Sequence, residues 1–415
     1  MTSARGRIGR NFIWKSAAEG SKGLSALYFI LLARSLGTTE LGRFSVGYSA
    51  AMMLAVLGDF GLNTLLTRHV AVDRSKGTTV FLQTAYLKLI FFTVLAVGTI
   101  LWPGLGARRM FVLLFLGIAA SRNLIDQLSY LCLAYEMLII EAQMKFLLGF
   151  LSLALACLAL NLWPSVNVAA GALLSAQMFA AIVGLGLVVR HAISLPEIAR
   201  LPALGWPVSD VKELLAMTLI NVSLAGFSRI DISCLNWLGV APANIGNYFA
   251  AERIIAMACL LPGVLAIASL PVFSRPEDAG HMGTIGRLRR ELFIAGCLAG
   301  AALYLLGGPL IGLIYGANYH GAIRPLAWLG LALPFMFVNH FSLIALIADK
   351  RTWQAAFAAF AAFALNIIID WTMIPRLGIF GAVMGAVTAQ ATIASLSWFF
   401  LMPKIQRKQM LEAMH

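Results

Sequence analysis

Long apolar runs separated by short polar gaps dominate the chain. A helix of about 20 mostly apolar residues is long enough to cross the hydrocarbon core of a bilayer. Because these runs are continuously apolar, they favour helices over barrel strands, which alternate in pieces of about 10 residues. The sequence therefore predicts an all-α integral membrane protein with twelve transmembrane helices, near residues 12–36, 41–67, 79–102, 108–133, 137–162, 166–190, 211–237, 243–272, 290–314, 322–348, 352–372 and 379–402.

A proline-containing gap at residues 191–210 divides these helices into two sets of six. The gap holds Pro196, Pro202 and Pro207, which is typical of a linker rather than of a further span. We therefore expect an N-terminal lobe over 1–190, a cytoplasmic linker over 191–210, and a C-terminal lobe with a cytoplasmic tail over 211–415.

Weak internal similarity supports a duplication of the six-helix unit. Leu36-Gly37, followed by Gly42-Arg43-Phe44, has a counterpart in Leu238-Gly239, followed by Gly246-Asn247-Tyr248. Since six is an even number, both lobes would enter the membrane from the same side, related by a pseudo-two-fold axis along the membrane normal. Chance agreement of glycine and aromatic positions is the alternative.

Lysine and arginine in the gaps predict the orientation. If the N-terminus is cytoplasmic, eighteen basic residues fall in inner segments and three, Arg108, Arg109 and Arg376, in outer ones. An excess of Lys and Arg marks cytoplasmic loops. We therefore expect a multi-pass protein of the cytoplasmic membrane with both termini in the cytoplasm.

Composition narrows the functional classes. The apolar set makes up 60% of the 415 residues and the charged set 12%, with a net charge of +13. A soluble domain averages about 25% charged residues, so a soluble enzyme is excluded. The basic residues lie mostly between apolar runs, which argues against a nucleic-acid face. The five cysteines show no CxxC spacing, and we expect no metal site and no cofactor apart from a possible coupling H⁺ or Na⁺.

Charged residues inside the predicted helices are the strongest functional signal. Such residues are costly in a bilayer and mark pathways or structural ion pairs. Asp231 and Asp370 also lie in predicted spans, without an assigned role. We expect a cavity between the lobes with basic patches that bind an anionic diphosphate or its sugar, formed by Arg34, Lys88, Arg122, Arg229 and Arg253. The candidates for ion coupling are Asp59, Asp126 and Glu252.

The sequence resembles the polysaccharide transporter family, the oligosaccharide repeat-unit flippases of the multidrug/oligosaccharidyl-lipid/polysaccharide exporter superfamily. Its similarity lies in Leu32-Ala33-Arg34-Ser35-Leu36-Gly37 with Glu40-Leu41-Gly42-Arg43-Phe44, and in Arg229-Ile230-Asp231 with Ala251-Glu252-Arg253. The resemblance implies a twelve-helix, two-lobed fold. It also implies transport of a polyprenyl-diphosphate-linked oligosaccharide to the outer leaflet by alternating access, for O-antigen or exopolysaccharide. Polysaccharide polymerase machinery is a possible partner, and a two-lobed transporter can act as a monomer.

Two other functions stay open at this point. A multidrug exporter of the same superfamily would favour a more acidic or apolar cavity. A membrane glycosyltransferase or polymerase would need catalytic residues in an outer loop, but every predicted outer loop has about ten residues or fewer and no HExxH, GxSxG or Walker A run occurs. We therefore expect no enzymatic activity and no catalytic residue.

Overall fold

The computed structural model describes residue 14, residues 20–192, 211–260 and 281–402, and these residues form helices. The chain divides into two compact units, residues 1–225 and 226–415, and the boundary lies within helix α9. The expected linker at 191–210 lies almost wholly outside the described residues, so the expected lobe boundaries stay a prediction. Each unit is described below by itself.

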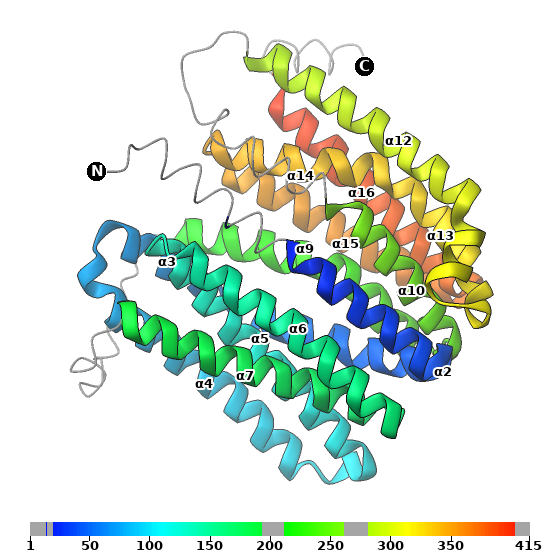
Figure 1. Ribbon diagram of the computed structural model, residues 1–415. Helices are drawn as coiled ribbons and strands as arrows, with labels where there is room; N and C mark the ends of the chain where they lie inside the picture. The colour runs from blue at the N-terminus through cyan, green and yellow to red at the C-terminus, as the bar shows by residue number, and fades with distance from the viewer. Residues whose placement is uncertain (1–13, 15–19, 193–210, 261–280, 403–415) are drawn as a thin grey trace. The chain divides into compact units, whose positions relative to one another are not determined.

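The described part of the first unit consists of helices joined by short 3-10 turns, together with the first half of α9 (Figure 1). Its elements in chain order are α2 (Lys22–Leu57), α3 (Leu62–Val72), η1 (Arg74–Lys76), α4 (Gly77–Leu101), η2 (Pro103–Arg108), α5 (Arg109–Ala134), α6 (Leu138–Leu162) and α7 (Val166–Ala192). Helix α5 packs against α2, α3, α4 and α7, and α6 packs against α2 and α7. Helix α5 is therefore the central helix of this unit.

The second unit contains most of the remaining elements, and α9 (Val211–Trp237) leads into it. The others are α10 (Pro242–Ala258), α12 (His281–Ile314), η3 (Ala317–Ala322), α13 (Ile323–Leu329), η4 (Gly330–Ala332), α14 (Leu333–Ala348), α15 (Thr352–Leu377) and α16 (Ile379–Leu401). Helix α16 packs against α15, α14 and α13, and α12 packs against α13 and α14.

The helix positions agree closely with the apolar runs, and the total of twelve spans stays a prediction because part of the chain lies outside the described residues. Eight described helices are long and apolar enough to cross a membrane, or up to ten if each of two bent helix pairs is one span. Two of the twelve expected spans, 12–36 and 41–67, meet in α2, which the glycine Gly37 interrupts at φ 73°. The span expected over 243–272 is described only as far as Leu260, and α10 has 17 residues.

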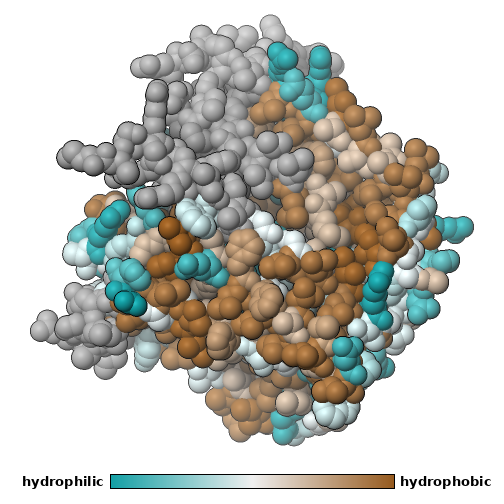
Figure 2. Space-filling view, viewed as in Figure 1, coloured by the Kyte–Doolittle hydropathy of each residue, from teal (hydrophilic) through white to brown (hydrophobic). Residues whose placement is uncertain are grey.

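Apolar side chains cover the outside of both units as well as their cores. Leu158 in the first unit and Leu305 in the second are 67% and 74% exposed. Apolar residues also spread over the visible described surface in Figure 2. Such extensive apolar surface is unusual on a soluble protein. The exposed surface is therefore that of a multi-pass membrane protein.

The turn between α3 and α4 is fixed by local polar contacts. Asp73 Oδ1 accepts hydrogen bonds from the Ser75 hydroxyl and backbone N–H at 2.6 and 3.1 Å, and Asp73 Oδ2 lies 3.4 Å from Lys76 Nζ. These hydrogen bonds, helped by the lysine charge, hold the pKa of the Asp73 carboxyl below its usual range. The Asp73 carboxyl therefore stays ionised in this turn.

The backbone of helix α12 lies directly against the backbone of η4 and the start of α14. A Cβ on Gly300 would lie 2.6 Å from the carbonyl oxygen of Gly330, and a Cβ on Gly296 would lie 2.7 Å from Pro334 N and 2.9 Å from Leu333 C. Because backbone atoms rather than flexible side chains occupy this space, only glycine fits at both positions.

We expect Gly296→Ala to destabilise the protein by about 1–3 kcal/mol, the usual cost of overpacking a tight contact. Gly312→Ala on the same helix is the control, since nothing lies within 4 Å of its Cβ position. Thermal unfolding of the two purified variants measures the difference. Equal or higher stability of Gly296→Ala would contradict the close approach.

Candidate functional site: two buried polar clusters

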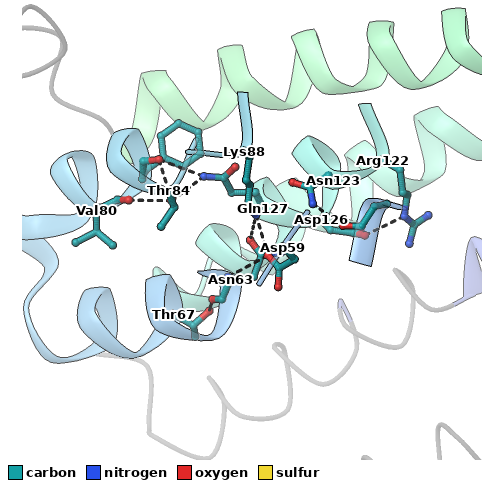
Figure 3. Close-up of polar contacts among 12 residues, drawn as sticks. Asp59, Asn63, Thr67, Val80, Thr84, Lys88, Arg122, Asn123, Asp126 and Gln127 are labelled. Atoms are coloured by element: carbon teal, nitrogen blue, oxygen red, sulfur yellow. Dashed lines mark hydrogen bonds and ion pairs between the residues drawn. The ribbon is translucent and has the colours of Figure 1, made fainter. Parts of the chain in front are cut away.

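The first polar cluster surrounds Lys88 on α4, whose side chain is 4% exposed (Figure 3). Its Nζ atom lies 2.8 Å from Asp59 Oδ1 and donates a hydrogen bond of 2.7 Å to Asn63 Oδ1. A buried ammonium group is unfavourable unless it is paired and hydrogen-bonded. Asp59 and Asn63 together meet that requirement.

Asp59 lies at a break between two helices. Helix α2 ends at Leu57 and α3 begins at Leu62, with a bend of 43° between them. Phe60 and Gly61 have φ values of 45° and 74°, and Asp59 Oδ1 accepts a hydrogen bond of 3.2 Å from the backbone N–H of Asn63. Broken helices are tolerated in membranes where internal polar groups satisfy the freed backbone. Asp59 therefore binds both the start of α3 and the lysine on α4.

Amide side chains of α5 complete this cluster (Figure 3). Asn123 Nδ2 donates to the carbonyl of Ala55 at 2.6 Å, and Gln127 Nε2 donates to Thr84 Oγ1 at 2.9 Å. The two amides are four residues apart, so they lie on one face of the helix. They tie α5 to the end of α2 and to α4, on either side of the ion pair.

Six of the eight predicted site residues form three oppositely charged pairs. Besides Lys88 with Asp59, Arg122 Nε donates to Asp126 Oδ2 at 3.0 Å, and Arg253 Nη2 lies 2.6 Å from Glu252 Oε2. These partners include all three acidic residues expected to couple ions. The structural ion pair, which the sequence left open for each of them, is therefore the arrangement observed, while their roles in transport stay a prediction.

The other two predicted arginines lie next to irregular backbone. Arg34 is exposed on α2, three residues before the break at Gly37. Arg229 is partly buried and begins the second segment of α9, which is bent by 57° from the first. Their part in substrate binding stays a prediction.

The Arg253 pair lies on α10 and is mostly buried. The Arg253 and Glu252 side chains are 15% and 12% exposed, and the guanidinium carbon lies 4.6 Å from the centre of the Phe249 ring. An arginine over an aromatic face gains a cation–π interaction. Its planar group can also bind a phosphate through two hydrogen bonds.

The second polar cluster, which we call the carboxylate site, consists of Asp231, Asn366 and Asp370. Asp231 on α9 accepts a hydrogen bond at Oδ2 from the Tyr248 hydroxyl and one of 2.6 Å at Oδ1 from Asn366 Nδ2. The Asp370 carboxyl, four residues after Asn366 on α15, contacts the Asp231 carboxyl. All three side chains are fully buried.

Unsatisfied oxygens in the carboxylate site converge on Gly385 of α16. Within the described residues, no N–H or O–H group donates to Asp370 Oδ1, Asp370 Oδ2 or Asn366 Oδ1, and the Cys234 thiol, a weak donor, is the partner of the Asp370 carboxyl. A Cβ on Gly385 would overlap Asp370 Oδ1 and lie 3.0 Å from Asn366 Oδ1. Two buried carboxylates in contact repel each other and lack solvation, so they require a proton or a metal cation.

The sequence named Asp231 and Asp370 as intramembrane charges but assigned them no role. Neither residue has a lysine or arginine three or four positions away, unlike Asp126 beside Arg122, but Asp59 and Glu252 share this feature, so it does not single out the carboxylate site. No pattern in one sequence indicates that α9 and α15 bring Asp231 and Asp370 together. Within the described residues, no group of three or more His, Cys, Asp or Glu side chains is arranged to hold a metal ion.

Buried ion pairs, broken helices and an apolar outer surface define an all-α, multi-pass membrane protein, and solved structures agree with this fold. An inward-facing multidrug resistance MATE family transporter of the MOP superfamily aligns with a TM-score of 0.71 at 15% identity, covering 91% of this chain and 93% of its own. The lipid II flippase MurJ, in its inward closed conformation, aligns with a TM-score of 0.70 at 13% identity, covering 94% of this chain and 87% of its own. These likenesses show the fold.

Sequence comparison shows the family. A profile described as "Polysaccharide biosynthesis protein" matches residues 8–276, which is more than half of the chain, and the chain belongs to this family. The expected family is thus confirmed. The probable flippase AglR of Haloferax volcanii is 26% identical over 196 residues, which are 45% of this chain. The match spans 40% of that relative's length.

Proposed function

We propose that the protein is a flippase that moves a polyprenyl-diphosphate-linked oligosaccharide from the cytoplasmic to the outer leaflet of the cytoplasmic membrane, for cell-surface polysaccharide. Membership of a polysaccharide biosynthesis family supports a polysaccharide-related substrate, and the similarity to the probable flippase AglR supports flipping. The proposed form is a monomer with twelve helices in two six-helix lobes, both termini in the cytoplasm, and alternating access as its mechanism.

The observation that carries the proposal is the burial of Arg253 in an apolar helix. Its guanidinium contacts the Glu252 carboxylate and the Phe249 ring, and the side chain is 15% exposed. Retaining a charge at such a position is costly, which favours a role in transport. A diphosphate would replace Glu252 as the partner of Arg253, because both present oxygens to the same planar group.

The same proposal includes coupling to a monovalent cation, H⁺ or Na⁺, at the carboxylate site. Asp59, Asp126 and Glu252 each have a basic partner that already balances their charge. Asp231 and Asp370 instead contact each other, and among the described groups Asp370 has only the weakly donating Cys234 thiol as a further partner. The carboxylate site is therefore the better candidate for cation binding.

The decisive experiment deletes the gene and assays lipid-linked oligosaccharide in each leaflet. We expect accumulation on the cytoplasmic side, rescue by the wild-type protein, and at least a tenfold weaker rescue by Arg253→Glu, whose new charge repels a diphosphate. Arg287→Glu is the control, since Arg287 is 82% exposed. Intact delivery to the outer leaflet in the deletion strain would refute the flippase. Drug or dye sensitivity without accumulation would instead support a multidrug exporter.

A further inference from the structure

Helix α10 connects the carboxylate site to the Arg253 pair. Tyr248 contacts Asp231, and Glu252 follows it by four residues, so the two side chains lie on one face of the helix. Phe249 and Arg253 have the same spacing and contact each other. Arg253 follows Tyr248 by five positions, which is about 7.5 Å along the helix axis. One short rigid segment therefore carries both groups.

The Tyr248 hydroxyl contacts the carboxylate site at Asp231, one of the two carboxylates that would bind a cation. The Tyr248 side chain is fully buried, and its hydroxyl donates to Asp231 Oδ2. Asn366 donates to the other Asp231 oxygen, whereas among the described groups Asp370 has only the weak Cys234 thiol as a donor. A cation or proton shared by Asp231 and Asp370 must therefore alter the charge of the carboxylate to which Tyr248 donates.

We propose that Tyr248 is the positioning residue through which cation occupancy of the carboxylate site changes the affinity of Arg253 for a diphosphate. The inference rests on the proposed function. A hydrogen bond to an ionised carboxylate is about twice as strong as a neutral one. Cation binding neutralises Asp231 and weakens the hydrogen bond from Tyr248, so the preferred position of α10 shifts.

Thermodynamic linkage makes this coupling reciprocal. The factor by which the cation changes the affinity for the diphosphate equals the factor by which the diphosphate changes the affinity for the cation. Typical factors are about 5–150-fold. The Tyr248 hydroxyl does not touch the diphosphate site itself. Its removal should therefore abolish the linkage while leaving both separate binding events in place.

The test uses the purified full-length protein and its Tyr248→Phe variant, with farnesyl diphosphate as the probe. Its affinity is measured with and without Na⁺ at fixed pH, then across pH without Na⁺, which separates sodium from protons. For the wild type we expect about a tenfold change in affinity with one of these cations. For Tyr248→Phe we expect less than a twofold change, with cation-induced thermal stabilisation retained.

Tyr28→Phe is the matched control. It also removes one buried hydroxyl, which donates to the Ala169 carbonyl at 3.4 Å in the first unit. We expect this variant to keep the wild-type linkage. A general loss of packing would affect both variants alike, whereas the inference requires that only Tyr248→Phe becomes insensitive to the cation.

The outcomes separate the inference from the proposed function. A Tyr248→Phe variant that keeps the full cation dependence overturns the inference and leaves cation coupling intact. A wild-type protein that neither Na⁺ nor protons stabilise, or that fails to bind farnesyl diphosphate, contradicts the proposed function and the inference with it.

A second measurement on the wild type does not depend on the folding of a variant. Cys259 directly follows α10 and lies against Met336 of α14. We expect saturating cation to change the rate at which a membrane-permeant maleimide labels Cys259 several-fold, as read by mass spectrometry. An unchanged rate would show that α10 does not move, and would overturn the inference.

Discussion

Asp370→Asn is expected to abolish stabilisation of the protein by its coupling cation and to stop coupled transport. The wild type should gain about 2.7 kcal/mol of stability when the cation is present at 100 times its dissociation constant. The variant should gain almost nothing, because asparagine leaves a single carboxylate, Asp231, that already accepts two hydrogen bonds. Thermal unfolding against Na⁺ and against pH measures the effect.

Two aspartates serve as controls for this variant. Asp349 has an exposed side chain paired with Arg351, so Asp349→Asn should behave like the wild type. Asp59 is balanced by Lys88, so Asp59→Asn should lower stability but retain the cation response. Loss of the response in Asp59→Asn with its survival in Asp370→Asn would place cation coupling in the first unit instead.

Lys88→Met is expected to lower the free energy of unfolding by about 3 kcal/mol or more. Removing one partner of a buried ion pair leaves an uncompensated charge, here Asp59 at the break between α2 and α3. The double variant Asp59→Leu/Lys88→Met should recover a large part of this loss, since replacing both charges with apolar groups is often neutral. Thermal unfolding of both single variants and the double variant measures the coupling.

The double variant also separates a structural pair from a substrate site. If Lys88 binds the diphosphate, as its sequence position predicts, the double variant should fold but fail to restore surface polysaccharide in a deletion strain. A folded double variant with normal transport would assign the pair to helix packing alone. If the double variant is no more stable than Lys88→Met, the pair does not act as a unit.

The apolar runs predict the helices well because the bilayer fixes their length. The expected 108–133, 137–162 and 379–402 correspond to α5 (Arg109–Ala134), α6 (Leu138–Leu162) and α16 (Ile379–Leu401). The interruption at Asp59–Gly61 was not predicted, since its residues lie inside a run that is long enough to cross without a break. Hydropathy averages over such a turn, whereas the structure shows the positive φ of Phe60 and Gly61.

Charges within a helix are easier to predict than their partners. The i,i+4 spacing of Arg122 and Asp126 indicates their ion pair directly. The contact between Asp59 and Lys88 joins residues from different helices, as does that between Asp231 and Asp370. Such contacts depend on helix packing, which a single sequence does not specify. The sequence therefore identifies the candidate residues by their charge and their position in apolar runs. Only the structure shows which of them contact one another.

The approach of Gly300 to Gly330 has a mechanical consequence. Where two backbones touch without interlocking side chains, one segment can glide along the other without forcing rotamers to change. Shear motions in proteins are small slides of this kind between packed helices. We therefore expect that α12 and the η4 turn can shift along each other within the second unit, and that a larger residue in place of Gly300 or Gly330 would obstruct the shift.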